Sequence, residues 1–293
     1  MNKRSIGVIA VIASAICFGL VPMLMKYLCS AGGNTLSVAF CRFFLSLLPI
    51  YLYLKIKKIP MAITKGQFGK ICLITIAGYG GTALLLFFSY EFIPTGMATT
   101  IHFVYPAMVI VFSIIFLKEK IQPIKLFCVA LCMIGIFLFY GGDGSINVIG
   151  MLLAFISGTT YAFYIIYLDK SELKDMDSLK LIFYMNAVSS VLILATALAT
   201  EQFVIEFTPF GWLVAFLFAT TVSFIAVLGF QIGVKYTGGQ NAAILSTFEP
   251  ITSVIIGVLV YNESFSTKGI LGCIFILAAT VIVARTKEPQ KIE

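Results

Sequence analysis

The stretch YPAMVIVFSIIFLKE at residues 105–119 is matched, 144 positions later, by EPITSVIIGVLVYNE at residues 249–263. In each stretch an apolar run follows a proline and ends at a glutamate, thirteen residues beyond that proline. Thirteen helical residues rise about 20 Å, so a proline near the middle of a membrane is joined to a glutamate at its surface. The pattern predicts two membrane-spanning helices with hinges at Pro106 and Pro250, since proline interrupts helical hydrogen bonding. A static kink would use the same two residues.

The rest of the 293-residue chain has the same apolar character. Hydrophobic residues make up 60% of it and charged residues only 11%, against about a quarter charged in soluble domains. Apolar runs of about 20 residues, the length that crosses a bilayer, follow one another with short connections. They do not alternate with a period of two, so helices and not barrel strands are expected. The predicted fold is an all-α integral membrane protein with ten transmembrane helices, at residues 6–29, 36–56, 71–92, 95–117, 124–140, 148–168, 179–198, 210–234, 241–260 and 269–284.

Basic residues predict how the chain is oriented. With ten spans, 17 of the 20 Lys and Arg residues fall on the side that also carries both termini, two fall on the other side, and Arg42 lies within a span. Basic loops stay in the cytoplasm, so both termini are expected there and the protein is expected in the cell membrane. No segment is long enough for a soluble catalytic or nucleotide-binding domain, and neither a cofactor, a metal nor a nucleic-acid partner is expected.

The 144-residue offset extends beyond the two proline–glutamate stretches, because it also aligns Ala98 with Ala242. We therefore expect two five-helix halves, residues 1–144 and 145–293. Five is odd, so the second half enters the membrane from the opposite side and the halves form an inverted repeat. Such repeats permit alternating access, in which two packings of the halves open a central site to one face or the other.

With these features the chain resembles the EamA-type members of the drug/metabolite transporter superfamily. The resemblance rests on the small-residue stretch ASAICFG at residues 13–19, on Arg42 in the second helix, and on the two proline–glutamate stretches. It implies that the halves are two EamA repeats, and that the protein is a secondary transporter of small metabolites, typically an exporter, with its cavity between the halves. Phe18 stands where many relatives carry tryptophan, which puts a stacking role there in doubt.

Charged side chains within a membrane are costly and are therefore candidates for function. Glu249 directly precedes Pro250, and His102, the only histidine, lies one turn before Pro106. Either side chain can exchange a proton as a cavity reorients. The alternative is a fixed hydrogen-bonded pair, or a histidine bonded to a carbonyl. Arg42 is expected to reach the membrane surface or to pair with Glu91. If it faced the cavity, it would instead clamp a carboxylate or a phosphate.

Neutral polar residues in the spans are the remaining candidates, because small-molecule sites combine aromatic walls with a few polar groups. Most of these polar residues are expected to serve as contacts between helices instead. Gly229 and Gly233 are expected to allow close helix packing. The neutral candidates for contact with the substrate are Tyr79, Tyr105, Tyr161, Asn186, Gln231 and Ser246.

The sequence favours a secondary transporter of a small metabolite, preferably an amino acid, that works by alternating access with or without proton coupling. A zwitterion would place its ammonium at Glu249 and its carboxylate near His102 or a backbone amide. Efflux of cationic or lipophilic drugs is the alternative. An intramembrane enzyme is disfavoured because the spans contain one His and no Asp, and a receptor because two matched halves indicate flux. The expected partners are the solute, membrane lipid and protons, with the protein a monomer or a homodimer.

Overall fold

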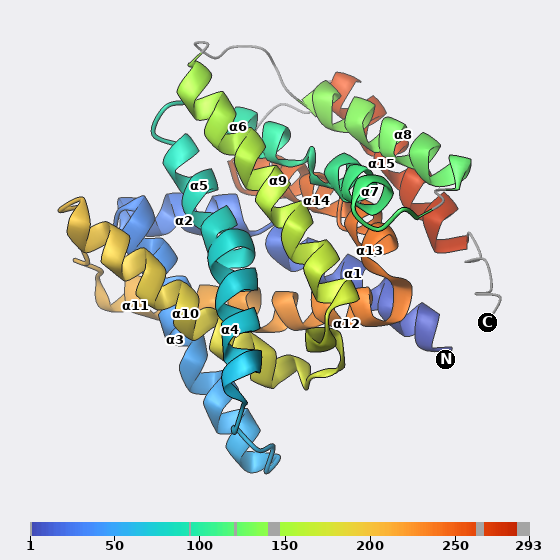
Figure 1. Ribbon diagram of the computed structural model, residues 1–293. Coiled ribbons are helices and arrows are strands. Elements are labelled where there is room, and N and C mark those ends of the chain that lie inside the picture. The colour runs from blue at the N-terminus through green and yellow to red at the C-terminus, as the bar shows by residue number, and fades with distance from the viewer. Residues whose placement is uncertain (1, 94, 120–121, 140–146, 262–266, 286–293) are drawn as a thin grey trace.

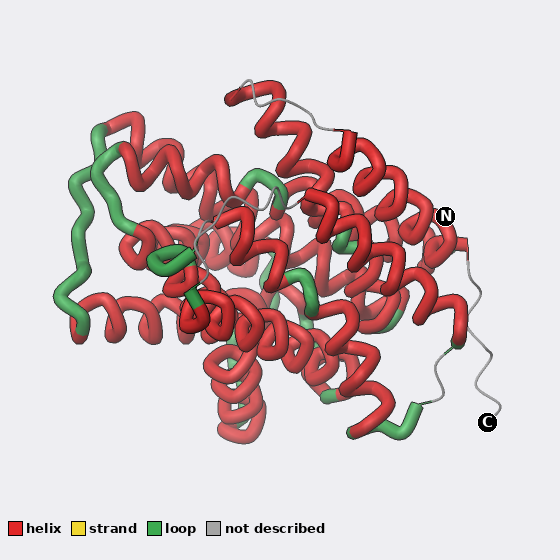
Figure 2. Tube along the Cα trace, turned by 90° about the horizontal axis from the view of Figure 1, so that it is seen from above, coloured by secondary structure: helices red, strands yellow, loops and turns green. Residues whose placement is uncertain are grey.

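The computed structural model describes residues 2–93, 95–119, 122–139, 147–261 and 267–285, and these residues form helices joined by short connections (Figures 1 and 2). Within these ranges the only β pairing is an isolated bridge between Gly33 and Ile205. The elements are α1 (Lys3–Phe18), α2 (Val21–Ser30), α3 (Thr35–Ile56), α4 (Lys65–Ile74), η1 (Thr75–Tyr79), α5 (Gly80–Ser89), α6 (Thr95–His102), α7 (Tyr105–Ile115), α8 (Pro123–Phe139), α9 (Val148–Lys170), η2 (Glu172–Asp175), α10 (Ser178–Ala199), α11 (Pro209–Phe218), η3 (Ala219–Ala226), α12 (Val227–Thr237), α13 (Gly239–Leu245), α14 (Phe248–Tyr261) and α15 (Thr267–Arg285).

Helices long and apolar enough to cross a membrane run through most of the described chain. Taken across their internal breaks, seven such helices occur in the described ranges, and Pro123–Leu138 and Ile270–Val283 are shorter apolar helices. The prediction of a helical, multi-pass membrane protein is confirmed. The prediction of ten spans stays a prediction. One reason is that the expected span 241–260 divides at Ser246 and Thr247 into α13 and α14.

Breaks occur where a proline lies just downstream. One expected helix, 95–117, divides at Phe103 and Val104, and Pro106 is the second residue of the helix that follows. Pro250 lies in the first turn of α14, immediately after the break at Thr247. Proline has no amide proton to donate and fits best in a first turn, so each apolar run ends one helix and begins another. A further break, at Gly19 and Leu20, precedes Pro22 and had not been predicted.

Two segments of π-helix interrupt otherwise regular spans. They are η1, which begins at Thr75, and η3, which begins at Ala219. The difference between these starting positions, 219 − 75, is 144, which is the offset of the sequence repeat. Such segments are rare and often mark functional sites. Here η1 ends at Tyr79, one of the predicted site residues.

The two predicted halves pack against each other along their length and share one apolar core. The most extensive helix contacts all cross between residues 1–144 and 145–293: α1 packs on α12, α3 on α10, α5 on α9, and α8 on α15 (Figure 1). Glycines permit the closest of these contacts, as predicted for Gly229 and Gly233. A Cβ atom at Gly233 would lie 2.0 Å from Cγ2 of Val11, and one at Gly229 would lie 2.8 Å from the carbonyl oxygen of Ala10.

Candidate functional site

A partly open cavity lies where the broken helices meet the π segment η1. The volume of this cavity is about 90 Å³, several times the volume that one water molecule needs. Three of its residues carry charge or can carry it, namely Arg42, His102 and Glu249. The other lining residues are mainly aromatic and apolar: Phe18, Val21, Pro22, Tyr79, Thr82, Ala83, Leu86, Phe87, Tyr90, Thr99, Tyr105 and Tyr161.

Glu249 enters the cavity from the first turn of α14, directly after the break in the chain. A helix N-terminus carries a partial positive charge, which favours a carboxylate there. The side chain is partly exposed, and it interacts electrostatically with Arg42, Tyr105 and Tyr161. Within the described part of the chain, no hydrogen bond or ion pair engages the Glu249 carboxylate. It is therefore available to a ligand.

His102 is the last residue of α6 and is held from one side. Its Nδ1 lies 2.9 Å from Oγ of Ser157, and that hydroxyl donates its proton to the carbonyl oxygen of Ala154 at 2.7 Å. A serine hydroxyl has one proton, so the neutral imidazole must donate through Nδ1, and Nε2 is then an acceptor. The described partner of His102 is thus the Ser157 hydroxyl, and neither Glu249 nor a backbone carbonyl, and the residue also lines the cavity.

Arg42 lies in α3 with only 7% of its surface exposed, so its side chain does not reach the membrane surface as we had expected. Three aromatic rings surround the guanidinium, whose central carbon lies 4.6 Å from the ring of Phe43, 5.8 Å from that of Phe87 and 5.9 Å from that of Phe218. Glu91, the expected partner, has an exposed side chain, and the described ion pairs do not join the two. The expectation was wrong because aromatic packing holds Arg42 inside, against the cavity.

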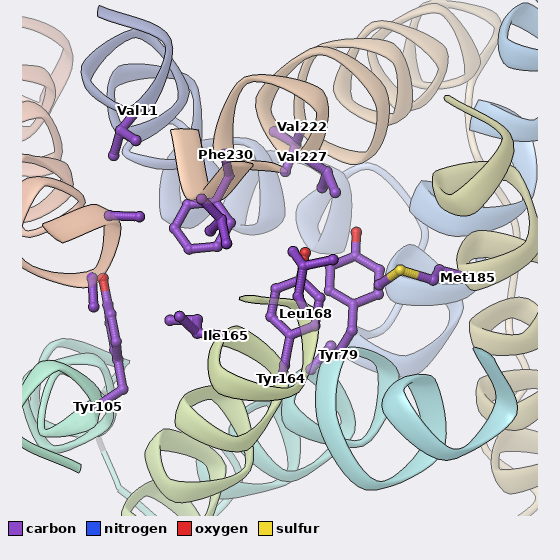
Figure 3. Packing of buried hydrophobic residues seen from close by; sticks show 14 of the residues in the cluster. Val11, Tyr79, Tyr105, Tyr164, Ile165, Leu168, Met185, Val222, Val227 and Phe230 are labelled. Atoms are coloured by element: carbon purple, nitrogen blue, oxygen red, sulfur yellow. The ribbon is translucent and has the colours of Figure 1, made fainter. Parts of the chain in front are cut away.

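Tyrosines build the wall between the charged groups. The rings of Tyr105 and Tyr161 meet edge to face at 4.9 Å, and Tyr161 and Tyr79 each lie 5.5 Å from Tyr164. Tyr105 donates to Oγ of Ser246 at 2.7 Å, since Ser246 donates to the carbonyl oxygen of Ala243. Figure 3 shows Tyr79 and Tyr164 side by side, with both hydroxyls toward Val222 and Val227.

Two predicted residues lie away from the cavity and connect helices instead. Asn186 is fully buried and donates to Oγ of Ser46 and to the carbonyl oxygen of Ser223, both at 2.8 Å. Gln231 is also buried, with Nε2 3.6 Å from Sδ of Met185. Ser246 touches the cavity only through Tyr105. Pro106 and Pro250 begin helices beside the cavity without lining it.

Several lining residues had not been selected from the sequence. Thr82 and Leu86 follow Tyr79 at intervals of three and four residues, which places all three on one helix face and was the available signal. Tyr90, Thr99 and Phe87 carry no comparable signal, because tyrosine, threonine and phenylalanine recur throughout the spans.

A cluster of polar side chains lies near the C-terminal ends of α7 and α9, away from the cavity. Glu119 pairs with Lys170 at 2.6 Å and accepts a hydrogen bond of 2.8 Å from Gln240, which in turn accepts one of 3.1 Å from Lys125. Asp169 contacts Lys170 at 3.3 Å and Lys174 at 2.6 Å. We call this set the Glu119 network. It joins residues 119 and 125, from the first predicted half, to residues 169–174 and 240, from the second.

The described residues contain no group of three or more His, Cys, Asp or Glu side chains arranged to hold a metal ion. Arg42 and Glu249 line the cavity with opposite charges and interact electrostatically, and no ion pair joins them. A cavity with separated opposite charges and aromatic walls is suited to binding a small polar solute.

Comparisons with known proteins extend the picture. The model of the EamA-like transporter family matches residues 5–141 and 148–285. An uncharacterized transporter of Archaeoglobus fulgidus is 25% identical over 95% of this chain and 96% of its own length, and the uncharacterized transporter YcbK of Bacillus subtilis is 24% identical over 93% and 91%. A probable sugar phosphate/phosphate translocator of Arabidopsis thaliana is 21% identical over 80% of each chain. A protein of known crystal structure shares the fold, with a TM-score of 0.83 at 14% identity over 95% of this chain and 96% of that one.

Proposed function

Because the chain belongs to the EamA-like transporter family, we propose that it is a secondary transporter that moves an amino acid or a related small metabolite by alternating access. One observation carries the proposal: a cavity among apolar helices holds a carboxylate, that of Glu249, beside an aromatic wall, and none of the described residues forms a hydrogen bond or an ion pair with this carboxylate. That the protein is a transporter follows from the family; the substrate, the direction and the coupling are proposals.

Recognition of an amine supports the choice of an amino acid. Glu249 offers a negative charge, and His102 offers an unprotonated Nε2 to a donor. Tyr105 and Tyr161 present ring faces, which attract cations and pack against apolar side chains. The cavity volume of about 90 Å³ suits a small molecule of a few heavy atoms. Efflux of purely cationic drugs is less well supported, because Arg42 lines the same cavity.

Organic phosphates are a second candidate. The observation in their favour is Arg42 in the cavity wall, since guanidinium groups bind phosphate through two parallel hydrogen bonds. The Arabidopsis thaliana relative named as a probable sugar phosphate/phosphate translocator points the same way. Glu249 would oppose a dianion, so an organic phosphate would have to carry an amine or bind with Glu249 protonated.

Alternating access is proposed between two inverted five-helix halves, residues 1–144 and 145–293. The shared 144-residue offset of η1 and η3 supports a repeated unit, and the pairing of helices across the halves supports an inverted arrangement. The Glu119 network would be the gate at the cytoplasmic side, closed while the cavity faces outward. Export then requires this network to open. Glu249 and His102 are the groups through which a proton would be exchanged.

Transport by purified protein in liposomes tests the proposal. Counterflow of radiolabelled amino acids should be saturable, and Glu249→Gln should reduce it at least tenfold, since the carboxylamide lacks the charge that holds an ammonium. Glu201→Gln is the matched control, because Glu201 is an exposed loop residue away from the cavity. Undiminished counterflow in the folded Glu249→Gln variant would remove Glu249 from the mechanism. A preference for quaternary amines over amino acids would favour drug efflux.

A further inference from the structure

Arg42 is a buried cation that has no ion-pair partner among the described residues. Its side chain is 7% exposed, it lies within a membrane-spanning helix, and its Nε is buried with no hydrogen-bond partner. The described carboxylates form no ion pair with it. Burying a charge without a counter-charge is strongly unfavourable. The cost is greater within a membrane than in a water-soluble protein. An arginine kept in this position therefore points to an anion that arrives from outside the protein.

The surroundings of Arg42 hold the guanidinium in place and leave it facing the cavity. The rings of Phe43, Phe87 and Phe218 contact it within 6 Å and offer it no hydrogen-bond acceptor. The Tyr79 hydroxyl interacts with it electrostatically and belongs to a residue that lines the same cavity. A guanidinium and a hydroxyl in the same wall both donate hydrogen bonds, and donors of this kind bind carboxylate and phosphate oxygens.

Glu249 and Arg42 line the same cavity and interact electrostatically, but they do not form an ion pair. The other residues that line the cavity are mainly aromatic and apolar, and surroundings of low polarity strengthen the interaction of each charge with a ligand. A ligand that spans the gap can satisfy both charges at once. The cavity therefore has two opposite poles, one for an anion at Arg42 and one for a cation at Glu249.

We propose that Arg42 binds the anionic group, a carboxylate or a phosphate, of the transported solute, and that the protein selects solutes which carry such a group. This assignment rests on the proposed transport function, and it moves the carboxylate of an amino acid from the vicinity of His102 to Arg42. It also predicts that amines without an anionic group bind poorly, although Glu249 alone would accept them.

The test compares ligands that differ only at the anionic group. Binding to purified protein in lipid nanodiscs is measured by thermal shift and titration for an amino acid, for the same amino acid as its carboxamide, for a monocarboxylate without an amine, and for inorganic phosphate. The wild-type protein should bind the amino acid at least about tenfold more tightly than the carboxamide, as expected for a charge-assisted hydrogen bond. Arg42→Gln should bind both with equal, low affinity.

Two variants accompany the wild type. Arg42→Lys keeps the charge without the paired donors and should retain part of the discrimination. Arg285→Gln, which removes an exposed arginine at the end of α15, should leave it unchanged. If Arg42→Gln does not fold, the comparison of Arg42→Lys with the wild type decides the matter, because unchanged discrimination in Arg42→Lys would overturn the role of Arg42.

Each result separates this inference from the function proposed above. Equal binding of amino acid and carboxamide would overturn the role of Arg42 and leave amino-acid transport standing. If amino acids fail to bind while the monocarboxylate or phosphate stabilises the wild type and not Arg42→Gln, Arg42 is the anion site and the amino-acid proposal falls. If none of the anions distinguishes the wild type from Arg42→Gln, the inference is wrong.

Discussion

At the scale of single residues, the cavity is defined by which polar groups the protein leaves unused. His102 is fixed through Nδ1, and only Nε2 remains for a ligand. Glu249 has no described partner at hydrogen-bond distance, and Arg42 is enclosed by rings that accept no proton. Polar groups that form no hydrogen bonds inside the protein remain able to bond to a solute. The bonds to a bound solute then offset the free-energy cost of burying these groups.

Ser157 controls the direction in which His102 presents its acceptor. We expect Ser157→Ala to destabilise the protein by about 1 kcal/mol, because Nδ1–H loses its acceptor, and to raise the KM of transport several-fold. Thr159→Ala is the matched control, since Thr159 lies on the same helix and bonds only to the carbonyl oxygen of Phe155. An unchanged KM for folded Ser157→Ala would mean that the solute does not depend on the orientation of His102. Counterflow at varied solute concentration provides the measurement.

At the scale of elements, close helix contacts carry the association of the predicted halves. α1 packs on α12 at a distance that only glycine permits, since a Cβ atom at Gly233 would overlap Val11. Lipid tails are as apolar as the helix surfaces, so close packing rather than exclusion of water drives such contacts. The bundle is accordingly sensitive to small increases in side-chain size along α1 and α12.

Gly233→Ala tests this contact. We expect a loss of about 1–3 kcal/mol of stability from overpacking, seen as a lower midpoint of thermal unfolding in detergent. Gly69→Ala is the matched control, because a Cβ atom at Gly69 meets nothing within 4 Å, and alanine in a helix is slightly stabilising. Equal midpoints for Gly233→Ala and the wild type would show that α1 and α12 can move apart without a loss of stability.

At the scale of the whole molecule, the cavity and the Glu119 network lie along the same helix, α9. α9 contributes Tyr161 to the cavity and Lys170 to the network. Nine helical residues separate them, a rise of about 13 Å. A single tilt of α9 against α7 would therefore alter both, which is the coupling that alternating access requires.

Reversing the Glu119–Lys170 pair tests whether the network is a gate. Glu119→Lys and Lys170→Glu should each change the counterflow rate at least several-fold by placing like charges together, and the double variant should recover most of it. The control pair is Lys70–Glu172, whose side chains are 44% and 54% exposed. Exposed pairs contribute little, so its reversal should have no effect. Failure of the double variant to recover would argue against a gate at Glu119.

Sequence patterns were most informative where one physical requirement acts on many residues. The need to bury about 20 apolar residues per span made the helical membrane fold readable, and the proline–glutamate repeat located two of the three breaks. Charged or titratable side chains in the spans also predicted the site, because burying a charge in a membrane is costly: Glu249, His102 and Arg42 all line the cavity. Neutral polar side chains did not predict it reliably. Asn186 and Gln231 lie in apolar runs as Tyr79 does, yet they connect helices.

The chain's amino acids by themselves determined a lipid-embedded helical protein with a repeat of 144 residues, because solvent compatibility and periodicity are properties of the linear order. Only the tertiary structure decided where the side chain of Arg42 lies. Snorkelling to the surface, pairing with Glu91 and facing a cavity are all compatible with its position in the helix. The rings of Phe87 and Phe218, which are 45 and 176 residues away along the chain, are what keep it inside, and a contact between distant segments exists only once the helices have packed.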